Sequence, residues 1–467
     1  MQKIGRIYGE IIGEKFTFAS KDFFKGNFVK IKEDETQESS PELVCEVLSR
    51  GVSNRFFTTP EVIKYLNDNM NFQRDTIYTY TVGSLGTVQN GKIISENVNA
   101  IPGKNVYAVE TELLKVVYGI SSEGQKIGHL KRMPTCEVVL DANRIFNPHL
   151  FIVGKTGSGK SYFTKRFLSR TTENFWVFSP TDEYSNLSEA KNGCKKLSDF
   201  TLNLDVDNIS YYADLNASEE NILRNISFHE DKIYTYKEFT NSIYEHYKRK
   251  KIGKPQQMIL EFLEEPSDDV LEIDLPAYAN SLISKLKKIR HLKFSKKQKN
   301  LQIPKDSIIF ELGEYTQLEQ ECILNYYLFD LLQRCKRTKE QNRKKHIIVV
   351  EEAHNYVPSV GNPLSKSILV RLAREGRKHG ISLCFITQRP RYFDQTALSQ
   401  SGNKIVFALP NPDDVKHIME DIPFYKPELS IGIQSQKVGE CMIVGDAFND
   451  ILETVVHFGE EDVQLTQ

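Results

Sequence analysis

Apolar and polar residues alternate in many short runs over the first quarter of the chain. Runs of this kind, which are typical of half-buried strands, occupy residues 4–13, 16–18, 27–31, 43–48, 77–82, 92–94 and 106–109. Asn90 and Gly91 stand between two of these runs and form a common hairpin turn. Several short strands at close spacing predict a small β-barrel or sandwich, which we place at residues 1–140.

From residue 150 onward the pattern changes to largely apolar runs that are separated by longer polar or helical segments. These runs lie at residues 150–153, 174–179, 307–312, 347–350, 381–387, 404–409 and 439–445. The branched apolar residues Ile347 to Val350 follow one another without interruption, as in a strand of a parallel sheet that is buried on both faces. The predicted fold class is therefore α/β, with a second domain at residues 141–467.

A charged, helical segment interrupts this second domain. Helices are predicted at residues 218–225, 236–250, 255–264 and 277–291. Two basic runs lie at 248–251 and 285–299, and the second contains no acidic residue. Such runs usually cover a solvated face, and they can also contact phosphates or an acidic partner. We predict a helical insertion at about 201–305.

Composition narrows the class of protein. A chain of 467 residues with 40% apolar content is long enough for two or three domains. The net charge of −1 gives no overall basic signal for nucleic acid, although a groove or pore needs only a local basic stripe. Seven cysteines without a C-x-x-C pair, and no signal peptide, indicate reduced thiols in the cytoplasm. No apolar run approaches the ~20 residues of a membrane span, so we expect a soluble protein with no membrane contact.

A glycine-rich segment, 154–161, joins the strand at 150–153 to a helix and fits the pattern G-x-x-x-x-G-K-S. The backbone N–H groups of such a P-loop surround a phosphate, and the helix N-terminus adds a favourable dipole. Lys160 would reach the β- and γ-phosphates of ATP, and the Ser161 hydroxyl would sit on Mg²⁺. A plain glycine turn is the alternative, but the flanking strand and helix favour a nucleotide site. The predicted nucleotide contacts are Gly154, Thr156, Gly157, Ser158, Gly159, Lys160, Ser161 and Tyr162.

Two carboxylates, Glu351 and Glu352, follow the buried run 347–350. In a P-loop ATPase the first acid at this position commonly orders Mg²⁺ through water, and the second orients or deprotonates the attacking water. Glutamate is one methylene longer than aspartate, so the metal-side geometry at Glu351 must shift accordingly. The alternative is a helix N-terminus that carries two acids.

Further polar residues lie beside the last runs. Gln388 ends the run 381–387 and is placed to sense the γ-phosphate of ATP. Arg374, Arg377 and Lys378 stand near the end of a predicted helix. They either favour the dipole at its C-terminus or place one cation, as an arginine finger, on the ATP of a neighbouring subunit.

In these residues the chain resembles the HerA family of hexameric DNA-translocating ATPases, within the wider HerA/FtsK group. The resemblance is carried by residues 154–161, 351–354, 374–380, 387–390 and 439–445. Three positions depart from the family pattern. Glu351 replaces the usual aspartate, Ser179 replaces a frequent aspartate, and Pro148 stands where a basic residue often precedes the P-loop strand.

The resemblance implies an N-terminal barrel of the HAS-barrel type, a RecA-like core with a helical insertion, and a ring of six identical subunits. ATP would bind between subunits and double-stranded DNA would pass through the pore. The implied catalytic residues are Lys160, Glu352, Arg377 and Gln388, with Ser161 and Glu351 toward Mg²⁺ and with Arg374 and Lys378 as alternatives for the finger. The implied partners are a nuclease such as NurA, or an effector with a sirtuin-like or nuclease domain in anti-phage defence.

Two functions fit these features. The first is an ATP-driven DNA translocase or helicase that works with a nuclease or another effector in DNA end processing or antiviral defence. The second is an ATPase ring that assembles and regulates a nuclease or NADase, with DNA translocation secondary. A conjugation-type coupling ATPase is disfavoured, because the sequence has no membrane anchor.

Overall fold

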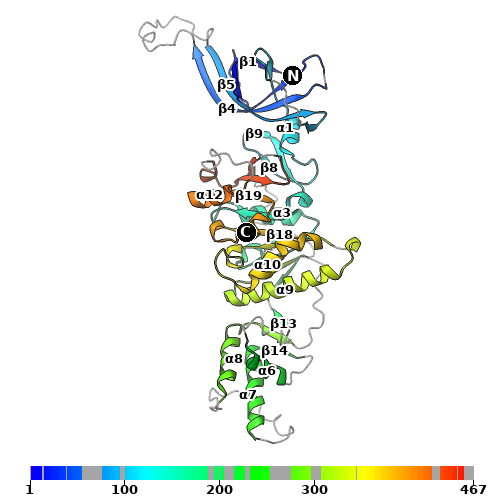
Figure 1. Ribbon diagram of the computed structural model, residues 1–467, viewed down its shortest axis with the longest axis vertical. Coiled ribbons are helices and arrows are strands. Elements are labelled where there is room, and N and C mark those ends of the chain that lie inside the picture. The colour runs from blue at the N-terminus through cyan, green and yellow to red at the C-terminus, as the bar shows by residue number, and fades with distance from the viewer. Residues whose placement is uncertain are drawn as a thin grey trace, which may run out of the picture. The chain divides into compact units, whose positions relative to one another are not determined.

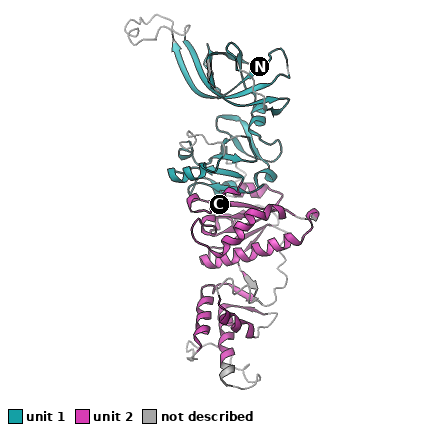
Figure 2. Ribbon diagram, in the orientation of Figure 1, with its two compact units in different colours: residues 1–163, 402–462 teal, residues 164–401, 463–467 magenta. Residues whose placement is uncertain are grey.

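The computed structural model describes residues 2–12, 15–37, 39–54, 76–94, 100–187, 194–198, 200–203, 215–226, 232–252, 275–295, 307–342, 344–422, 432–449 and 451–456. The chain divides into two compact units (Figure 2). Unit 1 contains residues 1–163 and 402–462, and unit 2 contains residues 164–401 and 463–467.

Unit 1 begins with an antiparallel β-barrel, whose strands β4 and β5 are its longest (Figure 1). Its strands are β1 (Lys3–Ile12), β2 (Lys15–Ser20), β3 (Phe28–Lys32), β4 (Glu42–Asn54), β5 (Thr76–Gln89), β6 (Lys92–Ile94) and β7 (Asn105–Ala108). The order is β2-β1-β7-β3-β4-β5-β6, and a further antiparallel pairing of β2 with β5 closes six of them. The structure therefore confirms the predicted barrel and excludes the sandwich.

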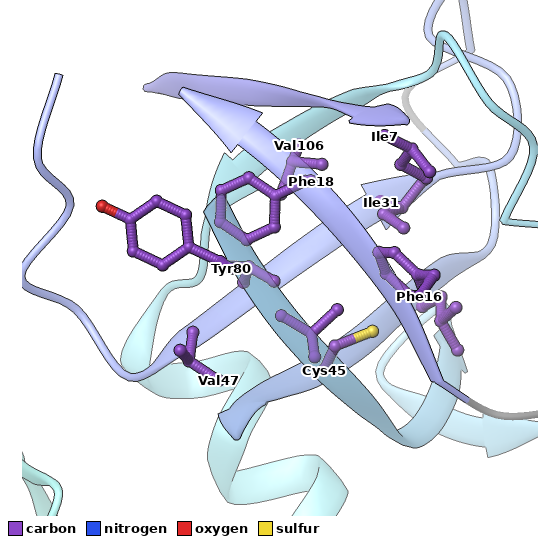
Figure 3. Packing of buried hydrophobic residues seen from close by; sticks show 11 residues of the cluster. Ile7, Phe16, Phe18, Ile31, Cys45, Val47, Tyr80 and Val106 are labelled. Carbon is purple, nitrogen blue, oxygen red and sulfur yellow. The ribbon is translucent and has the colours of Figure 1, made fainter. Parts of the chain in front are cut away.

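Aliphatic and aromatic side chains fill the barrel (Figure 3). Phe18 on β2 stacks on Tyr80 on β5 with ring centroids 4.7 Å apart, and both side chains are fully buried. The Tyr80 hydroxyl accepts a hydrogen bond from the backbone N–H of Phe24 at 2.7 Å. The polar end of this buried ring is thereby satisfied, as burial requires.

The rest of unit 1 is a second group of strands. Its elements are α1 (Thr111–Tyr118), β8 (Gln125–Leu130), β9 (Met133–Leu140), α2 (Ala142–Ile145), β10 (Leu150–Val153), β19 (Asn403–Phe407), α12 (Pro412–Met419), β20 (Glu440–Gly445) and β21 (Leu452–Val456). β10 and β19 are parallel, and β20, β21, β8 and β9 continue from β19 in antiparallel pairings. The sequence pattern did not predict β8 and β9. β8 pairs with β21 from the other end of the chain, and β9 pairs with β8.

Unit 2 contains a wholly parallel set of strands in the order β12-β16-β11-β17-β18. These strands are β12 (Lys195–Leu197), β16 (Ile308–Glu311), β11 (Asn174–Ser179), β17 (His346–Val350) and β18 (Ile381–Thr387). The main helices are α3 (Lys160–Arg170), which starts in unit 1, α9 (Gln317–Arg337) and α10 (Leu364–Glu375). Strand β17 lies between β11 and β18, which explains its uninterrupted apolar run.

The insertion between β12 and β16 is helical, as predicted, but it also contains strands. Its helices are α6 (Ala217–Asn225), α7 (Tyr236–Ile252) and α8 (Ala277–Lys287). Three strands that the sequence did not predict, β13 (Thr201–Asn203), β15 (Lys293–Ser295) and β14 (Ile233–Tyr234), form a small sheet. Strands of two or three residues are too short to show a period-2 pattern. The helix predicted at 255–264 lies outside the described residues.

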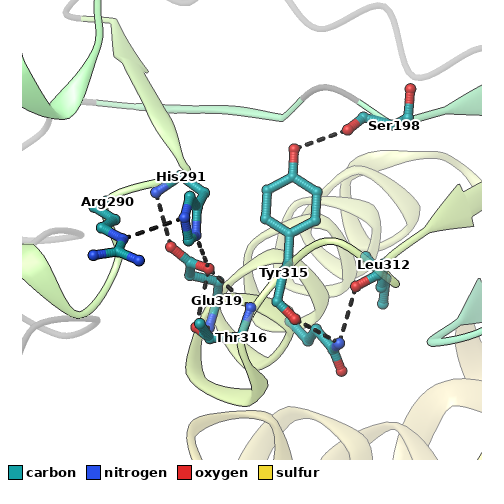
Figure 4. Close-up of polar contacts among 8 residues, drawn as sticks. Ser198, Arg290, His291, Leu312, Tyr315, Thr316 and Glu319 are labelled. Carbon is teal, nitrogen blue, oxygen red and sulfur yellow. Dashed lines mark hydrogen bonds and ion pairs between the residues drawn. The ribbon is translucent and has the colours of Figure 1, made fainter.

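A buried glutamate ties the end of this insertion to α9 (Figure 4). The Glu319 carboxylate accepts hydrogen bonds from the backbone N–H and hydroxyl of Thr316, which caps α9, both at 2.9 Å. It also accepts a bond from the backbone N–H of His291 at 2.9 Å and lies 2.9 Å from its Nδ1. Burial alone would raise the pKa of Glu319, but these hydrogen bonds lower the pKa below its ordinary value, so the carboxylate stays charged.

Asn403, at the start of β19, holds the chain that leads into β10 and the P-loop. Its fully buried amide donates to the carbonyls of Arg144 at 3.2 Å and Ile145 at 3.1 Å, and accepts from the Ala447 N–H at 2.9 Å. Three segments of unit 1 therefore meet at one side chain.

We predict that Asn403→Ala lowers the stability of the chain by about 2–4 kcal/mol, because it leaves several buried backbone groups without partners. The exposed Asn449 donates one hydrogen bond, to the Val116 carbonyl at 3.2 Å, so Asn449→Ala is the matched control and should cost less than about 0.5 kcal/mol. Urea unfolding of both variants measures the difference. Equal midpoints for the two variants would contradict the role of Asn403.

Candidate functional site: a P-loop and a paired acid

The P-loop connects β10 to α3 in unit 1 and follows the sequence prediction. Its backbone is anchored to both flanking segments: the Lys155 N–H donates to the Ala408 carbonyl at 2.8 Å, and the Gly439 N–H donates to the Ser158 carbonyl at 3.1 Å. Phe163 N–H donates to the Gly159 carbonyl at 2.9 Å, which starts the first turn of α3. The loop is thus held by the residue that follows β19, by the segment before β20 and by its own helix.

The loop requires glycine at three positions. Gly157 and Gly159 have φ of 73° and 112°, in the left-handed region that other residues rarely adopt. A Cβ at Gly154 would lie 2.6 Å from Cβ of Phe407 and 2.8 Å from Oγ of Ser158. At these positions no side chain covers the backbone N–H groups, and a phosphate can approach them closely.

Two polar side chains of the loop fit a bound phosphate. The Lys160 ammonium is buried and donates to the carbonyls of Gly154 at 2.8 Å and Lys155 at 3.0 Å. The Ser158 hydroxyl is buried and has no hydrogen-bond partner among the described residues. A buried hydroxyl without a partner costs free energy, and a phosphate oxygen would satisfy it. Ser161 and Tyr162 lie half-buried in the first turn of α3, and Thr156 is exposed at the tip.

The first acid, in unit 2, lies at the end of the buried strand β17. Glu351 is 5% exposed, and its backbone N–H donates to the Phe178 carbonyl of β11 at 3.0 Å. Its carboxylate accepts a hydrogen bond from the Tyr184 hydroxyl at 3.0 Å. Burial, and then the negative charge of Glu351, raise the pKa of Tyr184 far above its ordinary value, so the hydroxyl remains a donor.

The second acid is held in an unusual backbone conformation. Glu352 has φ 47° and ψ 45°, in the left-handed region that glycine normally occupies. Its Oε1 accepts a hydrogen bond from Nε2 of Gln388 at 2.9 Å, and its Oε2 lies 3.3 Å from Nδ1 of His354. Backbone conformations of this kind persist where the surroundings enforce them, and they are frequent at functional sites.

His354 links the acid pair to the end of β18. Its Nδ1 lies 2.9 Å from the Thr387 hydroxyl, which also accepts from the backbone N–H of Arg389 at 3.0 Å. Burial, and then the positive charge of Arg389, lower the pKa of His354 to about 4. At neutral pH the imidazole is therefore uncharged.

The candidate finger residues lie at the end of α10. Arg374, Arg377 and Lys378 are all exposed, and the side chain of neither arginine makes a hydrogen bond or ion pair with any residue that the structure describes. Glu375 lies between the two arginines in the sequence. Its carboxylate forms ion pairs with Lys336 at 3.0 Å and with Arg371. Both arginine heads are thus available to another molecule.

The structure therefore brings Gln388 to Glu352 within unit 2 and wraps the P-loop around Lys160 within unit 1. Sequence reasoning missed Tyr184 and Thr387. Thr387 directly precedes Gln388 at the strand end, a position that signals a ligand edge, whereas no pattern marks Tyr184. Within the described residues, no group of three or more His, Cys, Asp and Glu side chains is placed to hold a metal ion.

Comparison with known proteins points to the same class of protein. The family model described as the central domain of helicase HerA matches residues 125–331. A probable helicase of Methanocaldococcus jannaschii is 28% identical over 99% of this chain and 93% of its own length. The DNA double-strand break repair helicase HerA of Saccharolobus solfataricus is 37% identical over 28% of this chain and 27% of its own length. These matches support a HerA-family protein.

Among solved structures, VirB4 of Thermoanaerobacter pseudethanolicus shares the fold, with a TM-score of 0.50 at 16% identity over 74% of this chain and 99% of that chain. The P-loop ATPase fold, the matches to HerA helicases and the acid pair after a buried strand support an ATP-hydrolysing enzyme. In the described part of the chain, no helix combines the length and the apolar character needed to cross a bilayer.

The low pKa of His354 predicts a pH dependence of stability. Because the folded pKa of about 4 lies below the ordinary value of 6.5, the unfolded chain binds the proton more readily between these two pH values. Stability therefore falls as the pH is lowered from about 6.5 toward 4, by on the order of 1–3 kcal/mol from this residue.

His354→Asn keeps a hydrogen-bond donor and removes the titration. Denaturant unfolding at pH 7 and at pH 4.5 should show a smaller pH-dependent loss for this variant than for the wild type. An identical loss in the two proteins, or an NMR titration of His354 centred near pH 6.5, would show that the imidazole is not held neutral.

Proposed function

We propose that the chain is the subunit of an ATP-driven ring that translocates double-stranded DNA. The observation that carries the proposal is the geometry of Glu352: a carboxylate in a left-handed turn, held by Gln388 and lying beside neutral His354. A site that only binds a nucleotide does not need a strained, oriented carboxylate after the P-loop ATPase strand. Relatives named as DNA double-strand break repair helicases support DNA as the substrate of the motor.

In this proposal the P-loop backbone and Lys160 hold the β- and γ-phosphates of ATP. Ser161 and Glu351 would hold Mg²⁺, directly or through water, and the ion would supply positive charge to the phosphoryl oxygens. Glu352 orients the attacking water and takes its proton. Gln388 donates to Glu352, so a change at the γ-phosphate that moves this carboxylate is transmitted to β18.

Arg377 is the proposed arginine finger, with Arg374 and Lys378 as alternatives. Its exposed guanidinium, without a partner in the described part of its own chain, supports a role on the ATP of a neighbouring subunit. We propose that six subunits form the ring and that residues 1–140 and 141–467 are its two domains, the second interrupted at about 201–305. We also propose that the ring works with a nuclease of the NurA kind or an effector with a sirtuin-like or nuclease domain, in DNA end processing or anti-phage defence.

Lys160→Ala should abolish ATP hydrolysis, because the P-loop then lacks the cation that contacts the β- and γ-phosphates. A steady-state phosphate-release assay with and without double-stranded DNA measures the loss and tests DNA stimulation. Normal hydrolysis by the variant would mean that the site is assigned wrongly. Hydrolysis by the wild type that DNA does not change, in a ring that co-purifies with its effector, would favour the scaffold function instead.

Arg377→Ala should keep ATP binding and reduce turnover by on the order of 10³-fold or more, as expected for the loss of an arginine finger. Arg371, in α10, is also exposed, but it forms an ion pair with Glu375. Arg371→Ala is therefore the matched control and should retain most of the activity. Nucleotide binding and turnover are measured on the same preparations. Loss of binding in Arg377→Ala would indicate a structural role for Arg377.

A further inference from the structure

Tyr184 lies against the metal-side acid. Its side chain is fully buried in a 3-10 turn, η4 (Asp182–Tyr184), which follows β11. The hydroxyl donates to Oε2 of Glu351 at 3.0 Å. A neutral donor thus meets a carboxylate that is 5% exposed, in a setting where a hydrogen bond to a charged group is strong.

The other side of this hydroxyl is also engaged. The side chain of Thr164 forms a hydrogen bond with that of Tyr184. Thr164 is 3% exposed and lies in α3, three residues after Ser161, the residue that the P-loop motif directs to Mg²⁺. The contacts therefore run from the helix that follows the P-loop, through a tyrosine hydroxyl, to the acid at the end of β17.

The turn that carries Tyr184 is anchored independently of the acid. Ser185, the next residue, donates from its hydroxyl to Oε1 of Glu311, the last residue of β16, at 2.8 Å. The phenol is rigid and has few rotatable bonds, so a fixed turn gives a fixed hydroxyl. The position of the Tyr184 hydroxyl is therefore fixed by the turn and does not depend on its contact with Glu351.

Glu351 needs such an anchor because its side chain is long. The backbone N–H bond to Phe178 fixes only the start of the residue. A glutamate has one more rotatable bond than an aspartate, and each free torsion spreads the carboxylate over more positions. A hydrogen bond at the far end selects one of them.

We propose that Tyr184 is a positioning residue that fixes the carboxylate of Glu351 where it orders the water bound to Mg²⁺, with Thr164 holding the tyrosine hydroxyl. Tyr184 acts through Glu351 and contacts neither nucleotide nor metal. The proposal rests on the proposed function, in which Glu351 serves the Mg²⁺ side of the ATP site.

The test is Tyr184→Phe in the full chain, with binding of a fluorescent ATP analogue measured against Mg²⁺ concentration. The Mg²⁺ concentration for half-maximal effect should rise on the order of tenfold, the size expected for one hydrogen bond to a charged group, whereas binding in EDTA should not change. ATP turnover at limiting Mg²⁺ should fall by a similar factor and recover partly at high Mg²⁺.

Tyr80→Phe is the matched control, because Tyr80 is also fully buried and the substitution removes the hydrogen bond that its hydroxyl accepts from the Phe24 N–H in the barrel. It should lower the melting temperature without changing the Mg²⁺ dependence. Thr164→Val should shift the Mg²⁺ dependence in the same direction by a smaller factor, and it keeps the test open if Tyr184→Phe folds poorly. In a Glu351→Gln background, Tyr184→Phe should add nothing further.

A wild-type Mg²⁺ dependence in both Tyr184→Phe and Thr164→Val would overturn the proposal. That result differs from a failure of the proposed function, in which the wild type itself would show no Mg²⁺-dependent binding or hydrolysis of ATP.

Discussion

A carboxylate at the end of a buried strand must be held by the protein, because removing a charge from water costs several kcal/mol unless hydrogen bonds replace the lost hydration. In unit 2 this constraint shapes the acid pair. Strand β17 is apolar because it lies between β11 and β18. The first residue beyond it, Glu351, is also buried, with only 5% of its surface exposed. The hydroxyl of Tyr184 donates a hydrogen bond to the carboxylate of Glu351, and the amide of Gln388 donates one to the carboxylate of Glu352. The hydrogen bonds of the two acids therefore connect the ends of three neighbouring strands, β11, β17 and β18.

The P-loop in unit 1 follows the opposite rule. There the backbone must be bare, so Gly157 and Gly159 adopt conformations closed to other residues, and a side chain at Gly154 would collide with Phe407. Lys160 rests on the carbonyls of its own loop, which holds the ammonium in place while compensating its charge. The P-loop offers backbone groups and a cation, and the end of β17 offers paired anions. Phosphoryl transfer uses both kinds of group.

Local signals carried most of the sequence prediction. Alternation over residues 16–18 and 77–82 predicted β2 and β5, and the run Ile347 to Val350 predicted the buried strand β17. The P-loop, the acids and Gln388 were predicted because strand ends beside such motifs have known chemistry. In contrast, the pairing of β2 with β5 that closes the barrel leaves no periodic trace in either strand. The same holds for Tyr184, whose hydroxyl reaches an acid 167 residues later, and for Asn403, which bonds to a carbonyl 259 residues earlier. Such contacts are made by single side chains across the fold, and only the structure reveals them.

The central claim is that ATP is hydrolysed between subunits, with Lys160 from one chain and Arg377 from the next. The most direct measurement mixes Lys160→Ala and Arg377→Ala subunits, each inactive alone, and follows ATP hydrolysis as their ratio varies. A Lys160→Ala subunit still supplies Arg377 to a neighbour whose P-loop is intact, so mixed rings should recover a substantial part of wild-type turnover near equal ratios. If mixed rings form, as native mass measurement would show, and remain inactive at every ratio, the two residues do not meet across a subunit boundary and the account is contradicted.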